Sequence, residues 1–148
     1  AGKLERVGSG LKSCILLGAA YSLVAFGVIL LFGKYLLLLF VNGDETAILE
    51  NARWFITMNS CFYFPLALVN IIRFMIQGMG FSKLAVFAGM FEMVARALAG
   101  FVLVPFFGFP AVGFANPLAW VFADIFLIPA YLHVKRRMEQ ALARQRAA

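Results

Sequence analysis

Four long apolar segments, separated by short turns, account for most of the chain. They cover about residues 11–41, 47–77, 84–106 and 112–134. Each segment reaches the roughly 20 apolar residues that a helix needs to cross the hydrocarbon core of a bilayer. The pattern therefore predicts an all-α fold, a polytopic membrane helix bundle with four transmembrane helices.

Glycine, proline and small polar residues mark the predicted turns between these segments. The sequence VNGDET at residues 41–46 contains an Asn-Gly pair, which breaks a helix. GMGFSK at residues 78–83 predicts a short basic loop, and PFFGFPAVG at residues 105–113 predicts a tight turn. These turns are short, so consecutive helices are expected to run antiparallel.

Three regions follow from this pattern: a polar connector at residues 1–10, a four-helix transmembrane domain at 11–134 and a basic tail at 135–148. The tail is predicted to form a short surface helix or a frayed end. Ten of the thirteen Lys and Arg residues lie in or beside the connector, the middle loop and the tail. Because basic residues collect on the cytoplasmic side, both termini are predicted to be cytoplasmic, in a multi-pass protein of the inner (cytoplasmic) membrane.

Composition excludes an ordinary soluble domain. Hydrophobic residues make up 64% of the chain and charged residues 14%, whereas soluble domains carry about 25% charged residues. A small soluble fold leaves too much surface exposed to bury this apolar content. The net charge of +6 does not indicate a nucleic-acid partner, because much of it lies in the tail beside a membrane helix. The expected surrounding partner is the lipid bilayer.

Polar groups inside the apolar segments are the strongest candidates for function. Glu92, Arg96, Asn116 and Asp124 lie within hydrophobic runs, where an ionisable group costs about 2.5–3.5 kcal/mol and usually faces a bundle interior or a wet cavity. Glu92 and Arg96 are four residues apart, which places them within pairing reach on one helical face. Their salt bridge either opens and closes during transport or is a permanent pair that fixes the third helix.

Asp124 has no evident partner within its own helix. A carboxylate buried without a cation holds a proton readily, which suits proton coupling. Alternatively, Asp124 pairs with Arg73 or Lys83, since all three are expected in the cytoplasmic half. The candidate ion-coupling residues are therefore Asp124, Glu92 and Arg96.

A proline near the centre of the second segment predicts a kink. Pro65 frees the carbonyl group four residues earlier, and broken helices are common around transporter binding sites, as well as in membrane helices with purely architectural roles. Polar or aromatic residues beside this kink and along one face of the fourth segment are candidates for a substrate cavity. These cavity candidates are Asn59, Tyr63, Pro65, Asn70, Asn116 and Trp120.

The sequence contains no recognisable catalytic arrangement. It has one histidine, two separated cysteines and no phosphate-binding glycine loop followed by lysine. The chain is therefore expected not to be an enzyme, to need no cofactor or metal, and not to use ATP. Gradient-driven transport, channel activity or a structural role remain.

Three sequence features together resemble one known family. They are GMGFSKLAVFAGMFEMVAR with its E-x-x-x-R pair, the following PFFGFPAVGFANPLAW, and the opening AGKLERV. In this order they resemble the C-terminal lobe of multidrug and toxic compound extrusion (MATE) transporters, of which this chain would supply the last four helices. The resemblance implies a twelve-helix antiporter with two six-helix lobes around a central cavity.

The resemblance also implies an activity, namely export of small organic, often cationic, compounds driven by a Na⁺ or H⁺ gradient. In some members a carboxylate in the helix that matches the second segment contributes to the cation site. Here that region reads NSCFYFPLALVN and has no acid. The implied partners are the substrate and either the remaining helices of a full-length transporter or other copies of this chain. Alternatives are a non-transporting membrane scaffold or subunit and a small homo-oligomeric transporter or channel.

Overall fold

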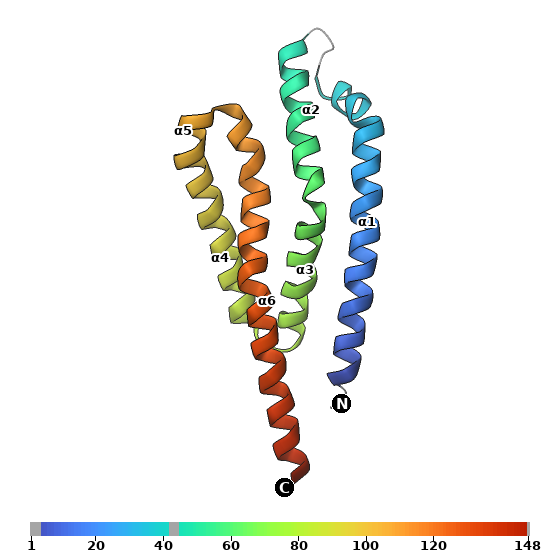
Figure 1. Ribbon diagram of the computed structural model, residues 1–148, viewed down its shortest axis with the longest axis vertical. Helices are drawn as coiled ribbons and strands as arrows, with labels where there is room; N and C mark the ends of the chain where they lie inside the picture. The colour runs from blue at the N-terminus through green and yellow to red at the C-terminus, as the bar shows by residue number, and fades with distance from the viewer. Residues whose placement is uncertain (1–3, 42–44, 148) are drawn as a thin grey trace.

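The computed structural model describes residues 4–41 and 45–147, and this part of the chain is helical with no strand. Figure 1 shows the helices side by side in an elongated bundle, which confirms the predicted all-α fold. The elements are α1 (Leu4–Leu38), α2 (Thr46–Cys61), α3 (Tyr63–Gly78), α4 (Ser82–Leu98), the π-helical turn η1 (Ala99–Leu103), α5 (Val104–Phe107) and α6 (Phe109–Ala147).

The predicted number of membrane spans agrees with these helices. Three continuous stretches are long and apolar enough to cross a membrane: Arg6–Leu38, Ser82–Phe107 and Phe109–Arg144. α2 and α3 pass the same test together and are bent by 50° where they meet, so as a single broken span they supply the fourth. The start of α1 and the end of α6 lie at the same end of the bundle (Figure 1).

The break between α2 and α3 lies one turn before Pro65. Proline has no N–H, so the carbonyl group of Cys61 has no partner four residues ahead. At the same place, the N–H of Phe62 donates to the Asn59 carbonyl oxygen, three residues earlier, at 3.1 Å. This turn is tighter than that of an α-helix. α3 then begins at Tyr63. The predicted kink is confirmed, and it is a complete break.

Two helices extend past the predicted limits of the apolar segments. α1 begins at Leu4, inside the predicted connector, and α6 continues without interruption to Ala147, where a short surface helix or frayed end was expected. The tail sequence KRRMEQALARQR consists mostly of strong helix formers, which explains its continuity with the span. The turn VNGDET falls partly on residues 42–44, which lie outside the described residues.

The third span ends at Phe107, close to the predicted end at about residue 106, and its last part is irregular. Residues 99–103 form a π-helical turn just before Pro105, and the helix then continues to Phe107. A single residue, Gly108, with φ of +66°, makes the reversal into α6. The nine-residue turn predicted here is therefore much shorter, because glycine at a positive φ reverses the chain in little space.

Packing centres on α6, which lies between α4 on one side and α2 and α3 on the other (Figure 1). α1 packs against both halves of the broken span. At Gly18 the helices approach so closely that an added Cβ would lie 3.0 Å from Ile71 Cδ1. The buried core is formed by α3, α4 and α6: Val69, Ile72, Ile76, Ala88, Trp120, Ala123, Leu127 and Tyr131.

Candidate functional site

Five polar side chains from four helices form one continuous series of contacts within the apolar bundle. We call this series the polar chain. It runs from Asn59 on α2 through Asn116 on α6, Arg96 and Glu92 on α4, to Arg73 on α3. Polar side chains that meet between membrane helices satisfy one another where water is absent, which is why they lie together.

Glu92 is the centre of the charged part of this chain. Its Oε2 accepts a hydrogen bond from Arg96 Nη2 at 3.2 Å, so the pair expected from the four-residue spacing is present. Its Oε1 accepts a second hydrogen bond, from Arg73 Nη2. The Glu92 residue is only 8% exposed. A buried carboxylate is thus held by two guanidinium groups from two helices.

The neutral part of the polar chain reaches the broken span. Arg96 Nε donates to Asn116 Oδ1 at 3.2 Å, and Asn116 Nδ2 donates to Asn59 Oδ1 at 3.1 Å. Asn59 Nδ2 in turn donates to the Phe55 carbonyl oxygen of its own helix at 2.9 Å. Asn59 lies three residues before Phe62, so these bonds connect α2, immediately before the break, to α6 and α4.

Exposure varies along the polar chain. The Arg96 side chain is 44% exposed, against 21% for Arg73 and 10% for Glu92. Two arginines with one glutamate give this group a formal charge of +1. The positive group therefore extends from the buried interface between α3 and α4 to the outer surface of α4.

Asp124 is buried on α6, and the structure leaves one of its oxygen atoms without a partner. The residue is 8% exposed, and within the described residues Oδ1 has no hydrogen-bond partner. The sequence left open a pair with Arg73 or Lys83. Arg73 contacts Glu92, and no ion pair within the described ranges includes Lys83 or Asp124.

The MatE family model matches residues 1–102. The chain belongs to the MATE transporter family. It is therefore a multi-pass membrane protein of a family of transporters rather than enzymes. Among curated proteins and among solved structures, no match was found.

The matched region contains four of the five residues of the polar chain. Asn59, Arg73, Glu92 and Arg96 lie within residues 1–102, and the match ends inside η1. α6 lies beyond the match. The MATE assignment thus rests on α1 to α4, and the roles of residues on α6 depend on the contacts in this structure.

Four of the nine candidate residues join the polar chain, and the remaining candidates lie elsewhere. Trp120 is 7% exposed and belongs to the apolar core, so its surroundings are those of a packing residue. Asn70 Nδ2 donates to the Leu66 carbonyl oxygen of its own helix at 2.9 Å. Tyr63 and Pro65 form the half-buried first turn of α3, at the break.

Arg73 was absent from the candidate residues although it completes the polar chain. From the sequence, Arg73 was expected only as a possible partner of Asp124. The turn GMGFSK joins α3 to α4 as an antiparallel hairpin, and Arg73 and Glu92 lie on its two arms, 19 residues apart. Counting outward from the turn, the two positions differ by five residues, about 7.5 Å or one and a half helical turns, a distance that a long arginine side chain covers. The hairpin register was the missed signal.

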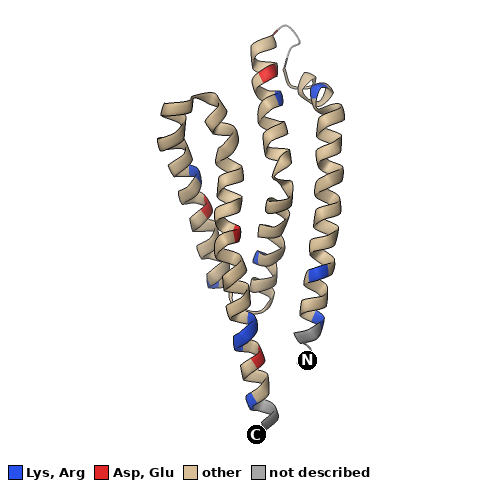
Figure 2. Cartoon of the chain, viewed as in Figure 1, with Lys and Arg blue, Asp and Glu red and all other residues tan. Residues whose placement is uncertain are grey.

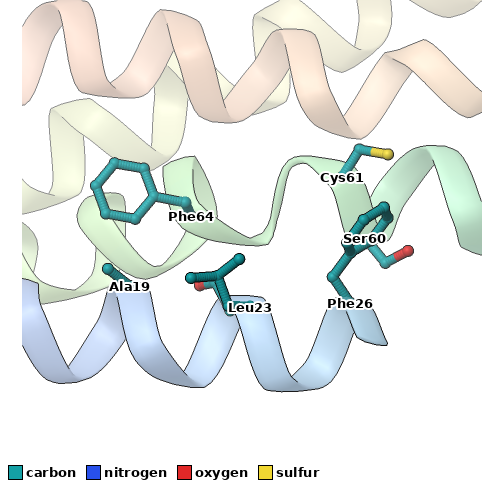
Figure 3. A pocket seen from close by; sticks show the side chains of 7 residues that line it. Ala19, Leu23, Phe26, Ser60, Cys61 and Phe64 are labelled. Carbon is teal, nitrogen blue, oxygen red and sulfur yellow. The ribbon is translucent and has the colours of Figure 1, made fainter. Parts of the chain in front are cut away.

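A groove of about 320 Å³ opens between α1 and the break in the second span (Figure 3). The hydroxyl groups of Ser22 and Ser60 donate to the carbonyl oxygens of Gly18 and Thr57, at 2.7 and 2.9 Å. The remaining lining is apolar. The lining residues are Ala19, Ser22, Leu23, Phe26, Ser60, Cys61 and Phe64.

The described residues offer no metal site built from protein ligands. Within residues 4–41 and 45–147, no three His, Cys, Asp or Glu side chains gather closely enough to hold a metal ion.

Proposed function

We propose that this chain is part of a secondary active antiporter that exports small organic, often cationic, compounds in exchange for Na⁺ or H⁺. The observation that carries this proposal is the polar chain, which crosses four apolar helices and meets the second span at its break. Ionisable residues at membrane depth are costly and mark ion or substrate pathways. Broken spans accompany such sites in many secondary transporters.

The two buried acids have different roles in this proposal. Glu92 contacts Arg73 on α3 and Arg96 on α4, so both of its oxygen atoms are engaged and it ties the two helices together. Asp124 has an oxygen atom without a partner within the described residues, and it is the acid available to a proton or Na⁺. Asn59 and Asn116, at the break, contribute polar contacts to the substrate.

A complete cavity needs more helices than four spans provide. The proposed partners are the remaining helices of a longer transporter or other copies of this chain, together with the organic substrate and the surrounding lipid. Many large apolar side chains, such as Leu16, Phe101 and Phe106, are more than two-thirds exposed and suit contact with lipid or further helices.

Charge supports an orientation with both ends in the cytoplasm, in the inner membrane. Figure 2 shows several basic positions near the end of the bundle where α1 begins and α6 ends, while the opposite end carries few. Basic residues collect on the cytoplasmic side. Labelling of an Arg144→Cys variant, in the basic tail, with a membrane-impermeant thiol reagent from either side tests this orientation, once Cys14 and Cys61 are replaced.

Transport is tested in lipid vesicles that contain the protein. A fluorescent organic cation should leave or enter the vesicles in response to an imposed pH or Na⁺ gradient, and Arg96→Ala should reduce this flux several-fold at equal protein content. A gradient without any effect on flux would reject antiport. Flux that needs no gradient would instead indicate a channel, and a particle without flux would indicate a scaffold.

A further inference from the structure

Two buried side-chain atoms lack a hydrogen-bond partner within the described residues, and they are complementary. One is the donor Arg73 Nε, and the other is the acceptor Asp124 Oδ1. A buried polar group without a partner costs about 1–3 kcal/mol. Arg73 meanwhile uses Nη2 to contact Glu92. In the described part of the chain, the buried Nε–H of Arg73 thus has no acceptor, and the buried Asp124 makes no ion pair.

The two unpartnered atoms lie on two helices, α3 and α6, that are neighbours in the bundle. α3 and α6 pack directly against each other. Arg73 follows Ile72, and Asp124 follows Ala123, and both of these apolar residues belong to the same core cluster. Arginine has a long, flexible stem that lets its charged end change partners while its Cα stays in place.

Few other charged or titratable groups can compete for Asp124. On α4, Glu92 and Arg96 contact each other, and the charged side chains of α1 and α2 that the structure describes are exposed. η1 and α5 carry no titratable residue. Most of the other titratable side chains described on these helices, and on α6 near Asp124, are exposed as well. The exposed ones are Arg6, Lys12, Lys34, Glu50, Arg53, Cys14, Cys61, Tyr21, Tyr35, Lys83 and His133, whereas Tyr63 is half-buried and Tyr131 is buried.

We propose that Arg73 is exchanged between two carboxylates: it pairs with Glu92 while Asp124 carries a proton, and it pairs with Asp124 when that proton has left. This inference rests on the proposed antiport and names the coupling residues. In the exchange, the O–H bond of the Asp124 carboxyl group breaks and the proton passes to water. The remaining carboxylate attracts the Arg73 guanidinium, which leaves Glu92 Oε1, while Arg96 keeps its contact with Glu92 Oε2.

The exchange links proton binding to helix contacts. With Asp124 protonated, Arg73 joins α3 to α4 through Glu92. With Asp124 ionised, the same arginine joins α3 to α6. An opposite charge favours the ionised form of a carboxyl group. A proton at Asp124 therefore decides which neighbour α3 is tied to, which is the property a coupling site needs.

Infrared spectroscopy of the protein in lipid vesicles tests the exchange. The stretching band of a protonated carboxyl group, assigned by its loss in Asp124→Asn, should be present at neutral pH. In Glu92→Gln, Arg73 loses its ionised partner and turns to Asp124, so the band should disappear at the same pH. Adding Arg73→Gln to Glu92→Gln should restore it. Lys83→Gln, which removes the other basic residue considered for Asp124, is the matched control and should leave the band unchanged.

Persistence of the band in Glu92→Gln, or failure of the double variant to restore it, would overturn the proposal. Should Glu92→Gln fail to fold, thermal unfolding of Arg73→Gln, Asp124→Asn and the double variant decides instead. Their effects should be non-additive at alkaline pH and additive at acidic pH, and additivity at both would reject the exchange. Gradient-driven flux of the unmodified protein is measured separately, so antiport can stand where the exchange fails.

Discussion

Asn116 makes two hydrogen bonds between helices, and Asn116→Ala removes both. Its Oδ1 accepts from Arg96 at 3.2 Å, and its Nδ2 donates to Asn59 at 3.1 Å. Hydrogen bonds between membrane helices contribute on average about 0.6 kcal/mol each and at most about 1.7 kcal/mol. Loss of both should therefore destabilise the protein by roughly 1–3 kcal/mol. The polar chain would then be cut between its charged part and the broken span.

Asn70→Ala is the matched control for this change. Asn70 is also a half-buried asparagine in a membrane helix, but its Nδ2 donates to Leu66 of its own helix, so its loss separates no helices. Unfolding is measured by titrating the protein in mixed micelles with a denaturing detergent. Asn116→Ala should unfold at a clearly lower fraction of denaturing detergent than Asn70→Ala. Equal shifts for the two variants would refute the view that Asn116 holds helices together.

Three further predictions test other parts of the structure. Pro65→Ala returns an N–H donor to the Cys61 carbonyl, so it should straighten the broken span, raise the melting temperature and slow flux. Flux at the rate of the unmodified protein would argue against a role of the break in transport. Gly113→Ala places a Cβ against the Trp54 ring and should cost about 1–3 kcal/mol in unfolding experiments, with Trp54→Leu relieving it. Glu92→Gln should lower the melting temperature more than Arg96→Gln, because Arg73 still holds Glu92 when Arg96 is neutralised; the reverse order would contradict the double pairing.

The spans and the contact between Glu92 and Arg96 were predictable because both depend on local sequence. A bilayer requires each crossing segment to be long, apolar and internally hydrogen-bonded, so hydropathy alone reveals it. A spacing of four residues places two side chains on one face of any helix. The break before Pro65 belongs to the same class, since it follows from one missing N–H.

The rest of the site depends on how the helices pack, which no local pattern encodes. Asn59 and Asn116 meet although 57 residues separate them, because α2 and α6 lie side by side in this bundle. Trp120 was a cavity candidate as an aromatic residue on one face of the fourth segment, and the structure places it in the buried core cluster. The apolar sequence around Asp124 indicates that this acid is buried, but it does not show which residues surround it.

The break at Phe62 divides the second span into two arms, and each arm is fastened to α4. Asn59, on the α2 arm, is connected to Arg96 through Asn116. Arg73, on the α3 arm, contacts Glu92, which lies one helical turn before Arg96 on α4. The span, α6 and α4 thus form a closed mechanical linkage around a hinge. A change in the bend angle between α2 and α3 must lengthen one of these two sets of contacts relative to the other. The bend angle of the span and the ion pairs of Glu92 are therefore expected to change together.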